Sequence, residues 1–78
     1  MSVSHGEALA AASKLLRTFG SAPDPKARGR EIHAELTRVA AWTQQQGDAI
    51  SAFGEWLRNY PTPSEIKPRC QQLLDRLR

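Results

Sequence analysis

The chain has 78 residues, of which 40% are hydrophobic and 24% are charged. A chain of this length folds as one small domain, which buries only about 60% of the surface that its unfolded form exposes. Length and composition exclude a multidomain enzyme, a cofactor-binding α/β fold and a membrane channel. We expect residues 1–78 to form a single helical domain in which residues 1–6 are a flexible N-terminus.

Basic residues outnumber acidic residues by 11 to 8, which gives a net charge of +3 at pH 7. This balance permits binding to nucleic acid or to an acidic protein, but it is also an ordinary charge for a small domain. The single cysteine, Cys70, cannot form an internal disulfide, which favours a cytoplasmic location. No segment has the pattern of a signal peptide or of a membrane span, so no membrane partner is expected.

The first predicted helix spans residues 7–19, where apolar residues recur every three or four positions. Gly20 follows it in the place of a helix stop, and two prolines fix residues 21–25 as a loop. The apolar stripe of this first helix consists of Leu9, Ala12, Leu16 and Phe19.

The second predicted helix begins either after Asp24, an N-cap residue followed by a proline, or at Glu31. The later start is an alternative because Gly29 weakens the first turns by roughly 1 kcal/mol relative to alanine. The helix is expected to continue to Gln45 and to stop at Gly47. Its apolar seam consists of Ile32, Leu36, Val39 and Thr43, with Trp42 at the edge.

Two further helices are predicted after Gly47. Asp48 is expected to cap a helix over residues 49–59, which Pro61 ends. Residues 62–65 (TPSE) have the pattern of a capping box and predict the start of a fourth helix. Pro68 either kinks this helix or delays its start, because proline lacks an N–H and collides with the carbonyl four residues earlier.

These four amphipathic segments predict an all-α fold, a small antiparallel bundle of four short helices with the last kinked or delayed at Pro68. The second and fourth helices have the narrowest apolar seams and are expected to pair closely. Because eleven of the 31 hydrophobic residues are alanine, the core is thin, and association with a partner would cover further apolar surface.

The chain lacks the residue patterns of a catalytic or metal site. His5, His33 and Cys70 are scattered and match no zinc-binding spacing, and Cys70 lies on the apolar seam of the fourth helix, which indicates a core residue. The glycines match no phosphate-binding loop. We therefore expect no enzyme activity, no catalytic residues, no metal and no cofactor.

A basic patch at the start of the second helix comprises Lys26, Arg28 and Arg30. Cations at a helix N-terminus oppose the helix dipole, which favours a functional role for the patch, although long side chains can also swing into water. The alternative function is therefore a nucleic-acid-binding regulator that uses this patch. The helix after Gly47 lacks the donors and cations of a DNA-recognition helix.

Trp42, Trp56 and Tyr60 lie at the edges of their apolar stripes rather than at the centres. Half-buried aromatic side chains are favoured anchors of protein interfaces, and Arg58 lies between two of them in the sequence. Trp42, Trp56, Arg58 and Tyr60 are therefore candidate protein-binding residues, and the alternative is that the aromatic residues close the ends of the core. The leading hypothesis is a protein-interaction module, an adaptor or inhibitor that binds and blocks a partner protein. Self-association into a homodimer is a further expectation.

Residues 56–66, followed by Cys70, resemble a stretch of small phage replication and helicase-loader-type proteins, in which an aromatic-Pro-x-Pro break starts the last helix. The resemblance covers about fifteen residues. It implies a phage-encoded protein that binds a host replication or regulatory protein, and it assigns no functional residue.

Overall fold

The computed structural model describes residues 4–39, 41–59 and 61–78. Within these residues the chain is helical and contains no strand, which confirms the all-α prediction. The elements are α1 (His5–Arg17), a short 3-10 helix (Phe19–Ser21), α2 (Pro25–Thr37), α3 (Gln44–Arg58) and α4 (Pro63–Leu77).

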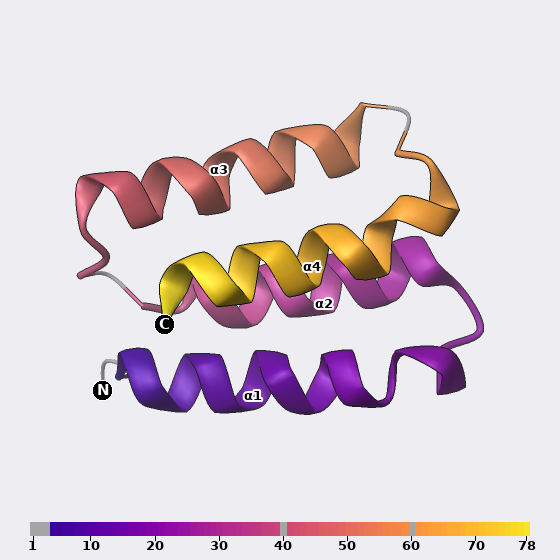
Figure 1. Ribbon diagram of the computed structural model, residues 1–78, viewed down its shortest axis with the longest axis horizontal. Coiled ribbons are helices and arrows are strands. Elements are labelled where there is room, and N and C mark those ends of the chain that lie inside the picture. Colours follow the sequence, from indigo (N-terminus) through magenta and orange to yellow (C-terminus); the bar gives the residue numbers. More distant parts are fainter. Residues whose placement is uncertain (1–3, 40, 60) are drawn as a thin grey trace.

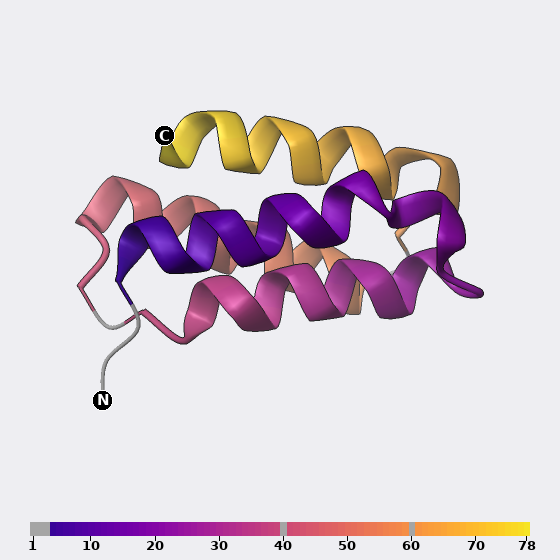
Figure 2. The same cartoon turned by 90° about the horizontal axis from the view of Figure 1, so that it is seen from below.

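The helices form an antiparallel bundle in which α2 and α4 are the central pair. These two helices contact each other, α1 packs against both from one side, and α3 packs against both from the other side (Figures 1 and 2). Successive helices run in opposite directions, so α1 and α3 run one way and α2 and α4 the other (Figure 1). The expected contact between the second and fourth helices is confirmed, and α2 also has an extensive contact with α1.

α1 begins two residues before the expected start, because the hydroxyl of Ser4 accepts a hydrogen bond from the backbone N–H of Glu7. His5 and Gly6 are therefore in the first turn of α1. The prediction for residues 1–3 lies outside the described residues.

The predicted boundary between the second and third helices is wrong. α2 ends at Thr37, and α3 begins at Gln44 rather than after Gly47. The physical reason is a capping box: Thr43 Oγ1 accepts from the backbone N–H of Gln46 at 3.2 Å, while the Gln46 side chain accepts from the backbone N–H of Thr43 at 3.1 Å. Asp48 is therefore inside α3 and is not its cap.

α4 is one helix from Pro63 onward, so the alternative of a start delayed to Pro68 is wrong. Pro63 stands in the first turn, where a missing N–H costs little, and Pro68 lies inside the helix with an exposed ring. Thr62 occupies the N-cap position as expected, but its side chain makes no cap hydrogen bond.

The core lies between the four helices and includes Gly29, which is buried. A Cβ at this position would lie 3.0 Å from Ile66 Cγ2 and 3.2 Å from Leu57 Cδ2, so glycine allows α2 to approach both α3 and α4. The buried hydrophobic residues are Ala8, Ala12, Leu16, Phe19, Ile32, Leu36, Val39, Ile50, Phe53, Leu57, Ile66, Cys70, Leu73, Leu74 and Leu77.

Candidate functional site

Trp42 closes one end of the bundle. Its indole Nε1 donates a 2.7 Å hydrogen bond to the backbone oxygen of Leu36, near the end of α2. The ring of His5 stacks on the indole, with 4.4 Å between the ring centres, and His5 Nε2 lies 2.9 Å from the backbone oxygen of Ala41. Trp42 therefore connects the α2–α3 segment to the start of α1. These contacts within the chain occupy both its indole N–H and one face of its ring.

Trp56 faces a different part of the molecule, along the seam between α3 and α4. It is half-buried beside Phe53, with 6.0 Å between the ring centres, and the guanidinium of Arg69 on α4 lies 4.3 Å from the centre of its ring. This contact is a cation–π interaction, which links Arg69 of α4 to Trp56 of α3.

Arg58, another candidate protein-binding residue, does not join Trp56. Arg58 is two residues further along α3 and is therefore about 200° around the helix from Trp56. Its charge acts on His33 of α2, on the other side of α3. Tyr60 lies outside the described residues. Of Trp42, Trp56 and Arg58, only Trp56 lies beside the groove between α3 and α4.

A groove runs between α3 and α4 next to Trp56. One hollow in it has a volume of about 180 Å³, and an adjoining hollow of about 280 Å³ extends it towards Gln45 and Gln46. We call the two hollows together the α3/α4 groove. The first hollow is lined by Ala49, Ala52, Phe53, Arg69, Gln72, Leu73 and Arg76.

Residue size explains why the space between these two helices stays open. Ala49 and Ala52 are one turn apart on the edge of α3, and their methyl groups are too short to fill the gap to α4. Phe53 and Leu73 form a buried floor. Small residues at the edge of an apolar helix face, here Ala49 and Ala52, are the sequence signal for such a gap, whereas the alanine content by itself predicts only a thin core.

Arg69 and Arg76 stand seven residues apart on the α4 side of the groove, and both are exposed. Within the described part of the chain, neither guanidinium has a carboxylate at ion-pair distance. The ion pairs found there are Arg28–Glu31, Arg38–Glu35 and Arg78–Asp75. The groove therefore combines an apolar floor with two unpaired positive charges.

The opposite flank of α4 is also basic. A further hollow, of about 300 Å³, lies between α1 and α4 and is lined in part by Arg17, Lys67 and Arg78. Residues 63–78 contain four cations (Lys67, Arg69, Arg76 and Arg78) and two carboxylates (Glu65 and Asp75), so α4 with its C-cap residue carries a net charge of +2. Arg17 of α1 adds a further positive charge on this flank.

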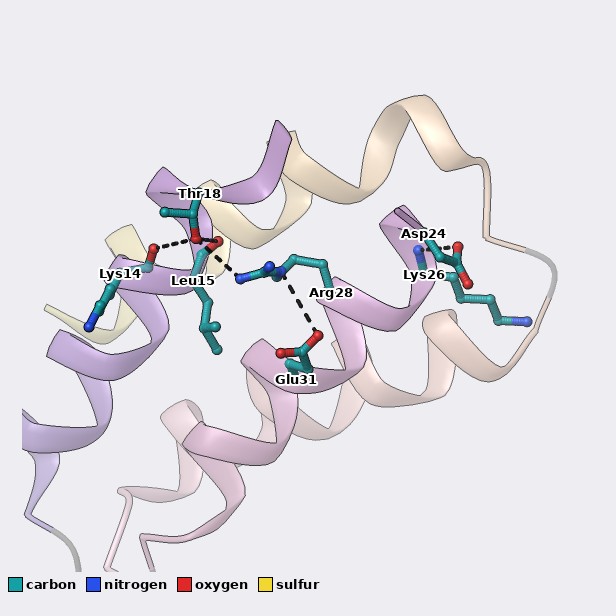
Figure 3. Close-up of polar contacts among 7 residues, drawn as sticks. All are labelled: Lys14, Leu15, Thr18, Asp24, Lys26, Arg28 and Glu31. Carbon is teal, nitrogen blue, oxygen red and sulfur yellow. Dashed lines mark hydrogen bonds and ion pairs between the residues drawn. The ribbon is translucent and has the colours of Figure 1, made fainter. Parts of the chain in front are cut away.

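The predicted basic patch at the start of α2 is divided in the structure (Figure 3). Arg28 turns towards α1, where its Nη1 donates to the hydroxyl of Thr18 at 3.2 Å and its Nε lies 3.9 Å from a carboxylate oxygen of Glu31. Only 15% of the Arg28 side chain is exposed. Lys26 and Arg30 are one helical turn apart, away from Arg28.

The buried titratable groups belong to the core rather than to the groove. Cys70 is fully buried, as predicted, and burial raises the pKa of its thiol to about 12. Burial also lowers the pKa of His33, which packs between α2 and α3. In the described segments, no three side chains of His, Cys, Asp or Glu come together as a metal site would require.

None of the helices in the described residues is long and apolar enough to cross a membrane. The chain matches no protein-family model, no curated protein and no solved structure.

Proposed function

We propose that the chain is a protein-interaction module, an adaptor or inhibitor, that binds another protein chain through the α3/α4 groove and blocks the surface to which it binds. The observation that carries this proposal is the pair of unpaired arginines, Arg69 and Arg76, above an apolar floor beside Trp56. Tryptophan and arginine are the side chains most enriched among residues that dominate binding energy at protein interfaces.

The shape of the groove favours a protein segment over a small molecule. Sites for small molecules are concave and bury most of the ligand's surface. The α3/α4 groove, with adjoining hollows of about 180 and 280 Å³, instead lies open between α3 and α4 and is flanked by the exposed residues Ala52, Arg69 and Arg76. A helix or extended segment of another chain could lie along it, with side chains directed towards Ala49 and Ala52.

The residues of the groove have separable roles in such a complex. The small side chains of Ala49 and Ala52 allow a second backbone to approach α3, and Phe53 and Leu73 supply buried apolar contact. Arg69 and Arg76 would pair with carboxylates, for which the planar guanidinium is well shaped. Binding is then selective for an acidic protein surface, and the module acts by steric exclusion.

The alternative function, nucleic-acid binding through the patch at the start of α2, has less support. Arg28 is bound to Thr18 within the chain, so only Lys26 and Arg30 extend from that part of α2. A binding titration with duplex DNA at increasing salt concentration separates the two functions. Binding to the phosphate backbone would weaken steeply with salt, by roughly one power of salt concentration for each phosphate neutralised.

A pair of matched substitutions tests the proposed function. Ala52→Arg places a long side chain in the groove, whereas Ala10→Arg makes the same change at an exposed helical position on α1. We expect affinity capture from a lysate of the native host, followed by mass spectrometry, to recover a protein with the wild-type chain and with Ala10→Arg but not with Ala52→Arg. Equal recovery by the two variants would show that the groove is not the binding surface.

A further inference from the structure

We infer that the segment which fits the α3/α4 groove is α3 of a second copy of the chain, so that the protein forms a symmetric dimer. This inference rests on the proposed function in one respect, the use of the same groove, so that a second copy and another protein chain would compete for it. In the dimer, Asp48 of each copy would pair with Arg69 of the other, and Glu55 with Arg76.

The acidic residues that would enter the groove lie on α3 itself. Asp48 and Glu55 are seven residues apart, both are exposed, and in the described part of the chain neither is at ion-pair distance from a cation. Residues seven apart on a helix lie on the same side. Ala52, exposed between them, completes a strip of α3 that is acidic at both ends and small in the middle.

The spacing of these carboxylates equals the spacing of the groove arginines. Arg69 and Arg76 are also seven residues apart on a helix, so both pairs span about 10.5 Å along their helix axes. A helix that lies parallel to α4 can therefore satisfy both arginines at once. The match is specific because a shift by one turn, about 5.4 Å, would separate both pairs.

Twofold symmetry gives the direction that this match requires. In a symmetric dimer whose axis crosses α3, the two α3 helices run antiparallel to each other. Since α3 and α4 of one copy run in opposite directions (Figure 1), α3 of the second copy then runs parallel to α4 of the first. Asp48 of the second copy meets the N-terminal arginine, Arg69, and Glu55 meets Arg76.

The alignment of α3 and α4 along their axes within one chain is also consistent with these ion pairs. Gln46 at the start of α3 donates to the backbone oxygen of Leu77 at the end of α4, and Arg69 lies over Trp56. These two contacts place Ala52 level with the middle of the interval between Arg69 and Arg76. An axis through Ala52 therefore brings each carboxylate to within about 2–3 Å, along the helix axis, of the level of its arginine.

Ala52 suits a position at the symmetry axis. Helices approach to about 8 Å only where the residues at the contact are small. The symmetric arrangement also doubles every contact, so that two acidic and two basic residues per chain give four ion pairs across the interface. Isolated surface ion pairs are weak, but those at the edge of an apolar contact select the partner and its register.

Charge reversal tests the dimer directly. The variant Arg69→Glu/Arg76→Glu and the variant Asp48→Arg/Glu55→Arg each place like charges opposite each other in a self-dimer. We expect sedimentation equilibrium to show a species of twice 8.7 kDa for the wild-type chain and dimerisation weaker by about tenfold or more for each variant. An equimolar mixture of the two variants restores opposite charges at all four pairs and is expected to dimerise again.

The matched control is Arg17→Glu/Lys67→Glu, which changes the net charge by the same amount on the other flank of α4 and should leave the dimer intact. Circular dichroism of each variant checks that it is folded, and recovery in the mixture excludes misfolding as the cause of dissociation. A wild-type chain that stays monomeric at high concentration, or a mixture that stays monomeric, overturns the inference. Capture of a different protein through the groove by such a monomer would leave the proposed function in place and overturn only the identity of the occupant.

Discussion

The imidazole of His33 on α2 lies directly against the backbone of α3 at Gly54. A Cβ at residue 54 would stand 2.5 Å from His33 Nε2, so the ring occupies the place that any other residue would fill with its side chain. The ring centre of Phe53, which is on α3 like Gly54, lies 6.2 Å from the ring centre of His33. This packing removes part of the imidazole from water and explains why its pKa is lowered.

The lowered pKa makes the stability of the fold depend on pH. Burial is the largest cause, a backbone hydrogen bond to Ile50 opposes it, and the positive charge of Arg58 adds to it. Above the ordinary histidine pKa of 6.5, the ring is neutral in the folded and the unfolded chain. As the pH falls below 6.5, the unfolded chain takes up a proton more readily, so the free energy of unfolding should decrease.

Urea unfolding of the wild-type chain at about pH 8 and at about pH 5.5 measures this decrease. We expect His33→Gln to remove this contribution to the difference, and Gly54→Ala, which displaces the ring, to reduce it. An NMR titration that gives His33 an ordinary pKa in the folded chain would contradict the prediction.

Two threonines at helix starts should differ in their contribution to stability. Thr43 accepts from the backbone N–H of Gln46, whereas Thr62 makes no side-chain cap hydrogen bond. Substitution of a cap that forms its hydrogen bond costs typically about 1 kcal/mol. We expect Thr43→Ala to lower the free energy of unfolding by about this amount and Thr62→Ala to change it by less than about 0.5 kcal/mol. Equal losses in chemical denaturation would contradict the assignment of the capping box.

Apolar spacing predicted the four helices and part of the core, but it did not predict the end of α2 and the start of α3. Of the stripe residues predicted for the first two helices, Ala12, Leu16, Phe19, Ile32, Leu36 and Val39 are buried, whereas Leu9 is half-buried and Thr43 is exposed. The apolar spacing misplaced the boundary near Trp42 because Thr43 continues the apolar spacing of α2, while its cap hydrogen bond to Gln46 depends on where the chain turns. Local patterns do not resolve such competition between a seam position and a cap.

The candidate groove was less accessible to sequence reasoning. Trp56 was recognised as an edge residue, but its neighbour across the seam, Arg69, comes from another helix, and the relative height of the two helices is set by tertiary packing. The basic patch shows the opposite case. Lys26, Arg28 and Arg30 are close in sequence, but residues two apart point to opposite sides of a helix, so Arg28 packs against α1.

The division of the basic patch leads to a further prediction. Arg28→Ala removes a largely buried side chain and its hydrogen bond to Thr18, which should lower the free energy of unfolding by about 1 kcal/mol. Lys26→Ala and Arg30→Ala should change it by less than about 0.5 kcal/mol. Thermal unfolding of the three variants measures the contrast, and a double-mutant cycle with Thr18→Val isolates the hydrogen bond. Equal stability of all three variants would show that Arg28 does not stabilise the fold.

Cys70 should be unreactive towards thiol reagents while the chain is folded. Its side chain is fully buried, and burial raises the thiol pKa to about 12, so almost no thiolate is present near neutral pH. We expect 5,5′-dithiobis(2-nitrobenzoic acid) to react only as the chain unfolds in urea, with a midpoint equal to that seen by circular dichroism. Fast, complete labelling of the native protein would contradict this burial. Cys70→Ser should destabilise the fold by about 1–3 kcal/mol because it places a hydroxyl in the core.

Two helical glycines, Gly29 and Gly47, have different surroundings. A Cβ at Gly29 would meet Ile66 and Leu57 at 3.0 and 3.2 Å, whereas nothing lies within 4 Å of the corresponding position at Gly47. Alanine is favoured over glycine inside a helix by about 1 kcal/mol. Gly47→Ala should therefore raise the free energy of unfolding by up to about 1 kcal/mol.

At Gly29 the same gain is opposed by overpacking between α2 and the helices α3 and α4, which costs typically about 1–3 kcal/mol. We expect Gly29→Ala to lower the free energy of unfolding in the urea experiment in which Gly47→Ala raises it. Stabilisation by both substitutions would mean that α2 can move away from Ile66 without loss of packing. The opposite signs would show that glycine at residue 29 is retained for helix contact, at the expense of local helix propensity.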